Sequence, residues 1–272
     1  MGVLQCHDQA LQIGTRTLIM GILNVTPDSF SDGGDFISVD KAVERAKQME
    51  AEGADILDIG GESTRPGADK VTLAEELRRV IPVVQAIRAA VSLPVSVDTY
   101  KAEVARQALE AGAHIINDVW GLKGDEAMAE VIVHYRCPVI LMHNRKVMNY
   151  ADFLADVVED MQANIQFAVD AGIDPSQIIL DPGIGFAKSY EQNLELMNHL
   201  NGLVALGYPV LLGTSRKSMI TKTLELPADD VIAGTAATVA LGIAQGCEII
   251  RVHDIEQMKR VARMTDAIVR RG

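Results

Sequence analysis

The chain has 272 residues, of which 48% are hydrophobic and 4% aromatic, and its formal net charge is −12 at pH 7. An acidic balance of this size argues against nucleic acid or an anionic membrane as a partner, because both repel negatively charged proteins. The length is close to the roughly 250 residues of a single (β/α)8 barrel, so composition and length do not demand a second domain.

The chain begins with a predicted β-hairpin, followed by eight short apolar runs. In the hairpin, within residues 1–16, the segments "VLQC" and "ALQIG" flank "HDQ". The apolar runs are rich in Ile, Val and Leu, and most lack the strict polar alternation of a half-exposed strand. This composition is typical of parallel strands that are covered on both faces. The runs occupy residues 17–25, 54–61, 94–99, 113–119, 138–143, 177–183, 208–215 and 247–254.

Segments of helical period separate these runs. Residues 38–53 place apolar side chains every three or four positions and end at Gly53, a typical helix C-cap. Residues 72–91 begin with Thr72 three positions before a glutamate, which predicts a capping box. We expect Pro82 to kink or divide that helix, since proline removes a helical hydrogen bond.

The alternation of eight strands with helices predicts an α/β fold, the (β/α)8 TIM barrel. We expect a single barrel domain over residues 1–272, with the hairpin of residues 1–16 closing the bottom of the barrel. A doubly wound open sheet is the alternative architecture. The strand count, and the lack of a dinucleotide-binding fingerprint after the first strand, favour the barrel.

Three cysteines bear on the cellular compartment. Cys6, Cys137 and Cys247 are odd in number, far apart, and form no C-x-x-C pair. We therefore interpret them as small core residues in a reducing compartment. No charged-then-apolar leader precedes Cys6, and no run approaches the roughly 20 apolar residues of a membrane helix. We expect a cytoplasmic protein.

Polar residues gather where the predicted strands end. Taken singly, an aspartate there is more often a helix cap, Asp118 is expected to be structural, and a histidine is more often a hydrogen-bonded loop residue. The set as a whole is harder to explain by folding, because burying an unpaired carboxylate costs several kcal/mol. The polar residues are Asn24, Asp58, Asp98, Asn117, Asp118, His143, Asp181, Lys217, Ser218, Arg251 and His253, and the apolar Met142 lies among them.

This set predicts the chemistry of a ligand. Strand ends of a barrel converge on one mouth, where barrel active sites lie. Ionised carboxylates only accept hydrogen bonds, so they suit a flat, nitrogen-rich ring with N–H donors. Lys217 can donate to a ring carbonyl or ring nitrogen, while Arg251 and His253 follow the strand that often precedes a barrel phosphate site. We therefore expect an amino-heterocycle that carries a phosphorylated arm.

Seven motifs spread over nearly the whole chain resemble the dihydropteroate synthase family of pterin-binding enzymes. They are "GILNVTPDSFSDGG", "DIGGESTRPGA", "SVDTYK", "HIINDVWG", "LDPGIGFAK", "GTSRKS" and "IRVHD". The resemblance implies a folate-pathway transferase of a group that sulfonamide drugs inhibit. It would condense 6-hydroxymethyl-7,8-dihydropterin diphosphate with p-aminobenzoate, with Mg²⁺ as cofactor, and release pyrophosphate and 7,8-dihydropteroate.

The resemblance also implies a role for each matching residue. Asp98, Asp181 and Lys217 would be catalytic, and together with Asn117 they would hold the pterin ring, with Asp58 and Met142 nearby. Asn24 would bind the metal and the diphosphate, which Arg251 and His253 would grip. The p-aminobenzoate site would be bordered by residues of several loops. These are Thr64, Pro66, Phe186 and Ser218, with Phe30 folding over them. Arg65 and Gly213 would be further substrate-binding residues.

The chain departs from many family members after His143, where "NRKVMNY" replaces a shorter turn, and at Met219, where an aromatic residue is frequent.

We expect a dissociative, SN1-like path, because an aromatic amine is a weak nucleophile. The glycine- and proline-rich loops after the first two strands would then act as lids that exclude water. The resemblance further implies a homodimer formed through the C-terminal helices. A methyltetrahydrofolate-binding methyltransferase and a non-catalytic pterin-binding homologue remain as alternatives.

Overall fold

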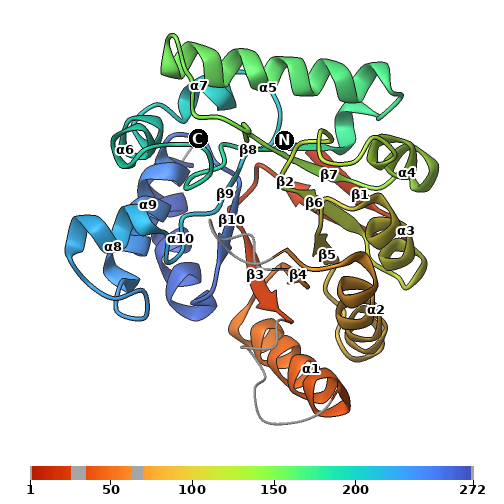
Figure 1. The fold of residues 1–272 in the computed structure, drawn as a ribbon. Helices are drawn as coiled ribbons and strands as arrows, with labels where there is room; N and C mark the ends of the chain where they lie inside the picture. Colours follow the sequence, from red (N-terminus) through yellow and green to blue (C-terminus); the bar gives the residue numbers. More distant parts are fainter. Residues whose placement is uncertain (1, 26–34, 63–69, 271–272) are drawn as a thin grey trace.

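Eight parallel strands form a closed barrel in the computed structural model, which describes residues 2–25, 35–62 and 70–270. The strands hydrogen-bond in the order β8-β7-β6-β5-β4-β3-β10-β9, and a bridge between Leu180 and Val210 joins the two ends of this row. This closure excludes the open sheet and confirms the predicted barrel (Figure 1). The strands are β3 (Leu18–Asn24), β4 (Ile56–Gly60), β5 (Val95–Asp98), β6 (Ile115–Asp118), β7 (Val139–Met142), β8 (Ile178–Asp181), β9 (Leu211–Leu212) and β10 (Ile249–Val252).

The strand register brings the polar strand ends to one level of the barrel. Asn24 pairs with Gly60, Gly60 pairs with Asp98, and Asp98 pairs with Asn117. Residues that are dozens of positions apart in the chain therefore become lateral neighbours around the mouth. The apolar residues before them are buried on both faces, which leaves the last residue of each strand as the one that meets the opening.

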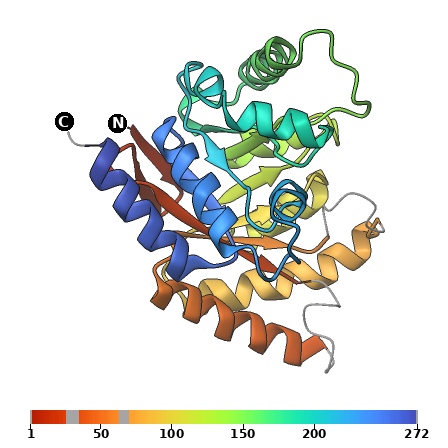
Figure 2. The same ribbon diagram turned by 90° about the vertical axis from the view of Figure 1, so that its left-hand side faces the viewer.

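An antiparallel hairpin of β1 (Gly2–Cys6) and β2 (Gln9–Ile13) closes the opposite end of the barrel, as predicted. Its inward residues Leu4, Cys6 and Ile13 are buried in the same apolar cluster as side chains from the barrel strands, Met20 and Ile140 among them. This cluster fills the bottom of the barrel. The N-terminal hairpin and the C-terminal helix lie side by side, where Arg270 Nη1 donates to the Gly14 carbonyl at 3.4 Å (Figure 2).

The helices lie outside the strands (Figure 1). They are α1 (Asp35–Glu52), α2 (Leu73–Ala90), α3 (Ala102–Glu110), α4 (Met128–Tyr135), α5 (Phe153–Asp170), α6 (Tyr190–Met197), α7 (Asn201–Val204), α8 (Ser218–Leu224), α9 (Ile232–Ala244) and α10 (Ile255–Val269), with a short 3-10 turn η2 (Pro175–Gln177). Among the described helices, none is long and apolar enough to cross a membrane. All three cysteines are free and buried, in agreement with their interpretation as core residues.

Two local expectations for α2 need correction. The helix is not divided at Pro82, while a kink there stays a prediction. The surrounding Val80, Val83 and Val84 are buried, and their packing offsets the roughly 3 kcal/mol that an interior proline costs. The predicted capping box is only half formed. Thr72 accepts the Glu75 N–H, but the Glu75 carboxylate turns outward to pair with two arginines of the helix.

Candidate active site

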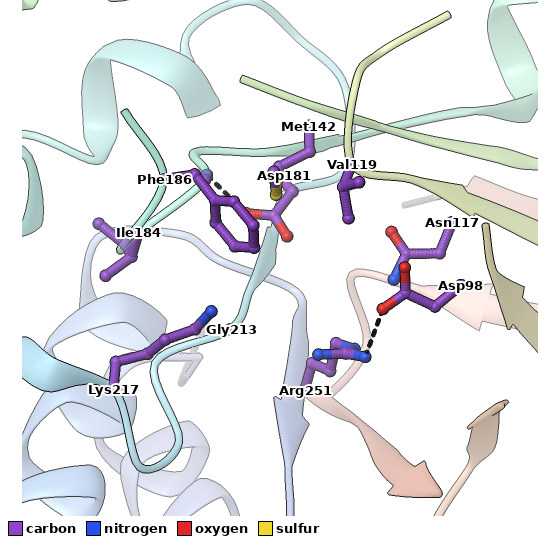
Figure 3. A pocket seen from close by; sticks show the side chains of 11 residues that line it. Asp98, Asn117, Val119, Met142, Asp181, Ile184, Phe186, Gly213, Lys217 and Arg251 are labelled. Atoms are coloured by element: carbon purple, nitrogen blue, oxygen red, sulfur yellow. Dashed lines mark hydrogen bonds and ion pairs between the residues drawn. The ribbon is translucent and has the colours of Figure 1, made fainter. Parts of the chain in front are cut away.

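A pocket of about 330 Å³, partly open to solvent, lies at the carboxyl ends of the barrel strands (Figure 3). Its lining comes from six strands or the loops after them, as expected for a barrel active site. Apart from Val119, Gly183 and Ile184, every lining residue is one of the substrate-binding residues predicted from the sequence. The lining residues are Asp98, Asn117, Val119, Met142, Asp181, Gly183, Ile184, Phe186, Gly213, Lys217 and Arg251.

The floor of the pocket is a buried cluster of two acids around Arg251. The Arg251 Nε donates to Asp58 Oδ2 at 2.6 Å, and the Arg251 Nη2 donates to Asp98 Oδ2 at 2.9 Å. Asn117 Nδ2 donates to the same Asp58 oxygen at 3.2 Å. Asp58 is fully buried just beneath the pocket lining, and the guanidinium supplies the countercharge that two buried carboxylates require.

One oxygen of each acid remains without a partner in the described part of the chain, Asp58 Oδ1 and Asp98 Oδ1. An unsatisfied buried acceptor costs about 1–3 kcal/mol, so its presence in a pocket points to a ligand donor. Burial raises the pKa of Asp98 to about 7, although the charge of Arg251 acts in the opposite direction. Asp98 is thus an acceptor whose pKa lies close to neutral pH.

Asp181 and Lys217 lie on the other side of the pocket (Figure 3). Asp181 Oδ1 accepts the Gly183 N–H at 2.7 Å, and the residue is only 7% exposed. Burial raises the pKa of this carboxyl, against the effects of the Gly183 hydrogen bond and of Lys217. Lys217 Nζ lies 4.4 Å from the centre of the Phe186 ring, which is within cation–π range.

The other predicted residues lie around the pocket or outside the described residues. Asn24 ends β3, where a Cβ on Gly60 would meet its Oδ1 at 3.5 Å. His253 Nδ1 is 3.0 Å from Ser215 Oγ, and Ser218 is exposed at the start of α8. Neither His253 nor Ser218 is part of the lining. Four predicted residues, Phe30, Thr64, Arg65 and Pro66, fall outside the described residues.

Asp118 has the structural role expected for it. Its two oxygens accept the backbone N–H groups of Trp120 and Leu122, each at 2.8 Å. Both carboxylate oxygens are therefore used within the loop that follows β6. Although Asp118 neighbours Asn117 in the chain, it does not line the pocket.

Similarity to known proteins identifies the family of this chain. A family model described as "Pterin binding enzyme" matches residues 20–253. The dihydropteroate synthase of Bacillus subtilis is 54% identical over 270 residues, which cover 99% of this chain and 95% of the relative. The chain belongs to the dihydropteroate synthase family.

Solved structures of family members agree closely with this fold. The Clostridium difficile dihydropteroate synthase, solved in the presence of pteroic acid, is 51% identical with a TM-score of 0.94, over 96% of this chain and all of that one. The Xanthomonas albilineans enzyme in complex with 7,8-dihydropteroate is 41% identical with a TM-score of 0.90, over 98% of both chains. The family expected from the motifs is thereby confirmed, and the chain is a transferase of this family.

Sequence reasoning missed some residues of this region. Val119, Gly183 and Ile184 line the pocket, but nothing in their residue type distinguishes them from core or turn residues. Lys188 was also missed, although it is 93% buried next to the pocket loop. A lysine in a loop motif is normally a surface residue, so only the three-dimensional packing reveals its position.

Proposed function

We propose that this chain condenses 6-hydroxymethyl-7,8-dihydropterin diphosphate with p-aminobenzoate and releases pyrophosphate and 7,8-dihydropteroate. Membership of the dihydropteroate synthase family supports this reaction. The observation that carries it is the pocket itself, where the acceptors of Asp98 and Asp181 face the cations of Lys217 and Arg251. The reaction needs this combination, because it joins a flat ring with N–H donors to a charged leaving group.

The pterin ring is held edge-on by the buried acceptors. Asp98 Oδ1 and the Asp181 oxygen not used by Gly183 are available to ring N–H and amino groups. The Asn117 side chain and Lys217 supply the donors that a ring carbonyl and ring nitrogen accept. Met142 lies among these polar groups and covers the face of the ring. Asp58 acts one layer below by fixing Asn117 and Arg251.

The diphosphate is held at the rim by Arg251, His253 and Asn24. Within the described residues, Arg251 Nη1 makes no hydrogen bond, so it remains free for a phosphate oxygen while Nε and Nη2 stay on the acids. The described residues contain no group of three His, Cys, Asp or Glu side chains placed to hold a metal. The amide oxygen of Asn24 is a hard ligand of the type that Mg²⁺ accepts beside phosphate oxygens and water.

These residues therefore fit a magnesium ion that arrives with the diphosphate rather than one held in an all-protein cage. When bound, Mg²⁺ neutralises negative charge on the diphosphate. Asn24 would hold it from the rigid end of β3.

The chain's residues suit a dissociative path. The C–O bond to the diphosphate breaks and its electron pair leaves with pyrophosphate, while positive charge spreads from the methylene carbon into the pterin ring. Asp98 and Asp181, whose side chains are largely buried, stabilise that charge through the ring N–H groups. The amine nitrogen of p-aminobenzoate then bonds to the methylene carbon. The N–H becomes acidic on bonding and its proton passes to solvent, so the reaction needs no strong general base from the chain.

p-Aminobenzoate would enter between Phe186, Lys217 and the start of α8. The ring of Phe186 offers an aromatic face beside the Lys217 ammonium, which suits an aromatic carboxylate. Ser218 is exposed at the first turn of α8, where its hydroxyl can meet the carboxylate end. Thr64 and Pro66 are assigned to the same substrate by family resemblance alone.

The enzyme would act as a homodimer through α9 and α10, which pack against each other. Leu241 is 58% exposed on α9, and Met264 and Ile268 are 63% and 65% exposed on α10. Residues four apart on a helix share one face, so Met264 and Ile268 form a continuous apolar surface. Such a surface is typical of a protein–protein interface.

The test of the proposed function is pyrophosphate release from the pterin diphosphate, measured with and without p-aminobenzoate and Mg²⁺. We expect release that requires Mg²⁺ and yields one 7,8-dihydropteroate for each pyrophosphate. Labelling the bridging oxygen with ¹⁸O tests the dissociative path: scrambling of the label in recovered substrate is expected when the amine is withheld. The absence of any dihydropteroate would exclude the proposed reaction.

A further inference from the structure

Lys188 is a buried amine that the proposed reaction does not use, and burial lowers its pKa to about 7. Its side chain, in the loop between β8 and α6, is 7% exposed. Its Nζ lies 3.0 Å from the Gly183 carbonyl, 3.0 Å from the Phe186 carbonyl, and 2.8 Å from His143 Nδ1. An ammonium group has three N–H donors, so these contacts use all of them.

His143 connects this amine to a charged group on α5. Its Nε2 is 3.0 Å from Asp160 Oδ2, an oxygen that also accepts Arg145 Nε at 2.6 Å. Because Nδ1 accepts from Lys188, the ring proton resides on Nε2 and is donated to Asp160. Burial and the charge of Lys188 lower the pKa of His143 to about 3, so the imidazole stays neutral in this role.

A second side chain holds the same loop from outside. Tyr150 OH donates to the Ala187 carbonyl at 2.7 Å, and the guanidinium carbon of Arg145 lies 4.3 Å from the centre of the tyrosine ring. Both residues belong to the "NRKVMNY" segment that follows β7. The carbonyls of Gly183, Phe186 and Ala187 are thus all taken by side chains from outside the turn that they form.

The turn has little freedom to relax on its own. Gly183 has φ +67°, and a Cβ at this position would lie 2.1 Å from the His143 carbonyl oxygen. Ala187 also has a positive φ of 46°, which is unfavourable for a residue with a side chain. The Phe186 N–H closes the turn on the Gly183 carbonyl at 3.0 Å. External contacts of this kind are what keep such a backbone in place.

The opposite side of this turn is the wall of the pocket. The Gly183 N–H holds Asp181 Oδ1 at 2.7 Å, and the Phe186 ring packs on the Lys217 ammonium (Figure 3). Any shift of residues 183–187 therefore moves an acid and an aromatic ring that both face the substrates. We propose that Lys188 and Tyr150 are positioning residues, which lock the turn at residues 183–187 so that Asp181 and Phe186 meet the pterin and p-aminobenzoate.

This inference rests on the proposed function, since it assigns a reason for holding the turn still. A purely structural role is the competing explanation. It predicts that loss of these contacts lowers stability and leaves the kinetics of the folded enzyme unchanged. A positioning role predicts changes in KM and kcat for each folded molecule, because preorganised geometry contributes directly to turnover.

The experiment compares two tyrosine variants and one lysine variant with the wild type. Tyr150→Phe removes one hydroxyl from the turn, and Tyr135→Phe is the matched control, since that hydroxyl donates to Glu110 Oε1 at 3.0 Å on the barrel exterior. Lys188→Met removes all three N–H donors while keeping a long side chain. Unfolding temperature, kcat, and KM for both substrates are measured for each purified protein.

We expect Tyr150→Phe to raise KM for p-aminobenzoate about three- to tenfold, the scale of one lost hydrogen bond, while Tyr135→Phe leaves it unchanged. Lys188→Met is expected to lower kcat by about tenfold or more. Equal kinetics for Tyr150→Phe and Tyr135→Phe would overturn the proposal, even if Lys188→Met fails to fold. Failure of the proposed function is a separate outcome, because the wild-type enzyme would then make no dihydropteroate.

Discussion

Asp181→Asn separates the electrostatic role of this residue from its role in the fold. Asparagine has nearly the same shape, and its remaining oxygen can still accept the Gly183 N–H, which Asp181 Oδ1 accepts at 2.7 Å. The second carboxylate oxygen becomes an amide NH2 group. That group donates, so it faces the ring N–H of the pterin as a second donor and no longer as an acceptor.

The size of the effect follows from this change. A hydrogen bond to a charged group contributes about 1.5–3 kcal/mol, and about 1.4 kcal/mol is a factor of ten in rate. Loss of one preorganised electrostatic group of this kind costs about 100- to 1,000-fold in kcat. We therefore expect kcat to fall about 100-fold. Burial already disfavours the charge of Asp181, so a neutral amide there should not lower the unfolding temperature.

The assay is pyrophosphate release at saturating substrates, paired with thermal unfolding of the same preparations. Asp55→Asn is the matched control, because Asp55 precedes β4 at the opposite end of the barrel, where its Oδ2 accepts the Ile19 N–H at 2.8 Å. We expect the control to lose some stability and no turnover. Near-normal kcat in Asp181→Asn would refute the assignment of this carboxylate to the developing positive charge.

Further predictions concern pH, the metal and assembly. Since burial raises the pKa of Asp98 to about 7, the acceptor is lost as pH falls below 7. Calorimetry should show pterin affinity decreasing from pH 8 to pH 6, and Asp98→Asn should give a shallower decrease, because the pKa of Asp181 is raised as well. Asn24→Ala should raise the Mg²⁺ concentration for half-maximal pyrophosphate release about tenfold, and an unchanged requirement would remove Asn24 from the metal site. Replacing Met264 and Ile268 together by glutamate should convert a dimer to a monomer in sedimentation. Val147→Glu is the control, since Val147 is 65% exposed away from α9 and α10, and it should leave the dimer intact. A wild-type monomer would contradict the proposed interface.

The barrel could be predicted from the sequence because each strand has a recognisable local pattern of residues. Runs such as residues 138–143 are short, β-branched and apolar on both faces, and they are bounded by helices of clear period. The convergence of Asp98 and Asn117 then follows from parallel pairing, which brings strand ends to one edge. The hairpin at the bottom was also predictable, since it precedes the first strand and has its own turn.

The pairing inside the pocket could not be predicted, because it depends on side-chain packing between residues far apart in the chain. Sequence reasoning assigned Arg251 to the diphosphate, whereas the structure also shows it bridging Asp58 and Asp98. The three donors of Lys188 likewise meet groups from two different loops. The helix is not divided at Pro82 for a related reason, since burial of one helix face outweighs a local penalty.

A crystal structure of this chain with bound 7,8-dihydropteroate tests the central claim most directly. We predict that the pterin ring places N–H groups about 3 Å from carboxylate oxygens of both Asp98 and Asp181, with its aminobenzoate arm directed toward Phe186. A ring bound elsewhere on the barrel, or one that left both carboxylates without a ligand donor, would contradict this account of the site.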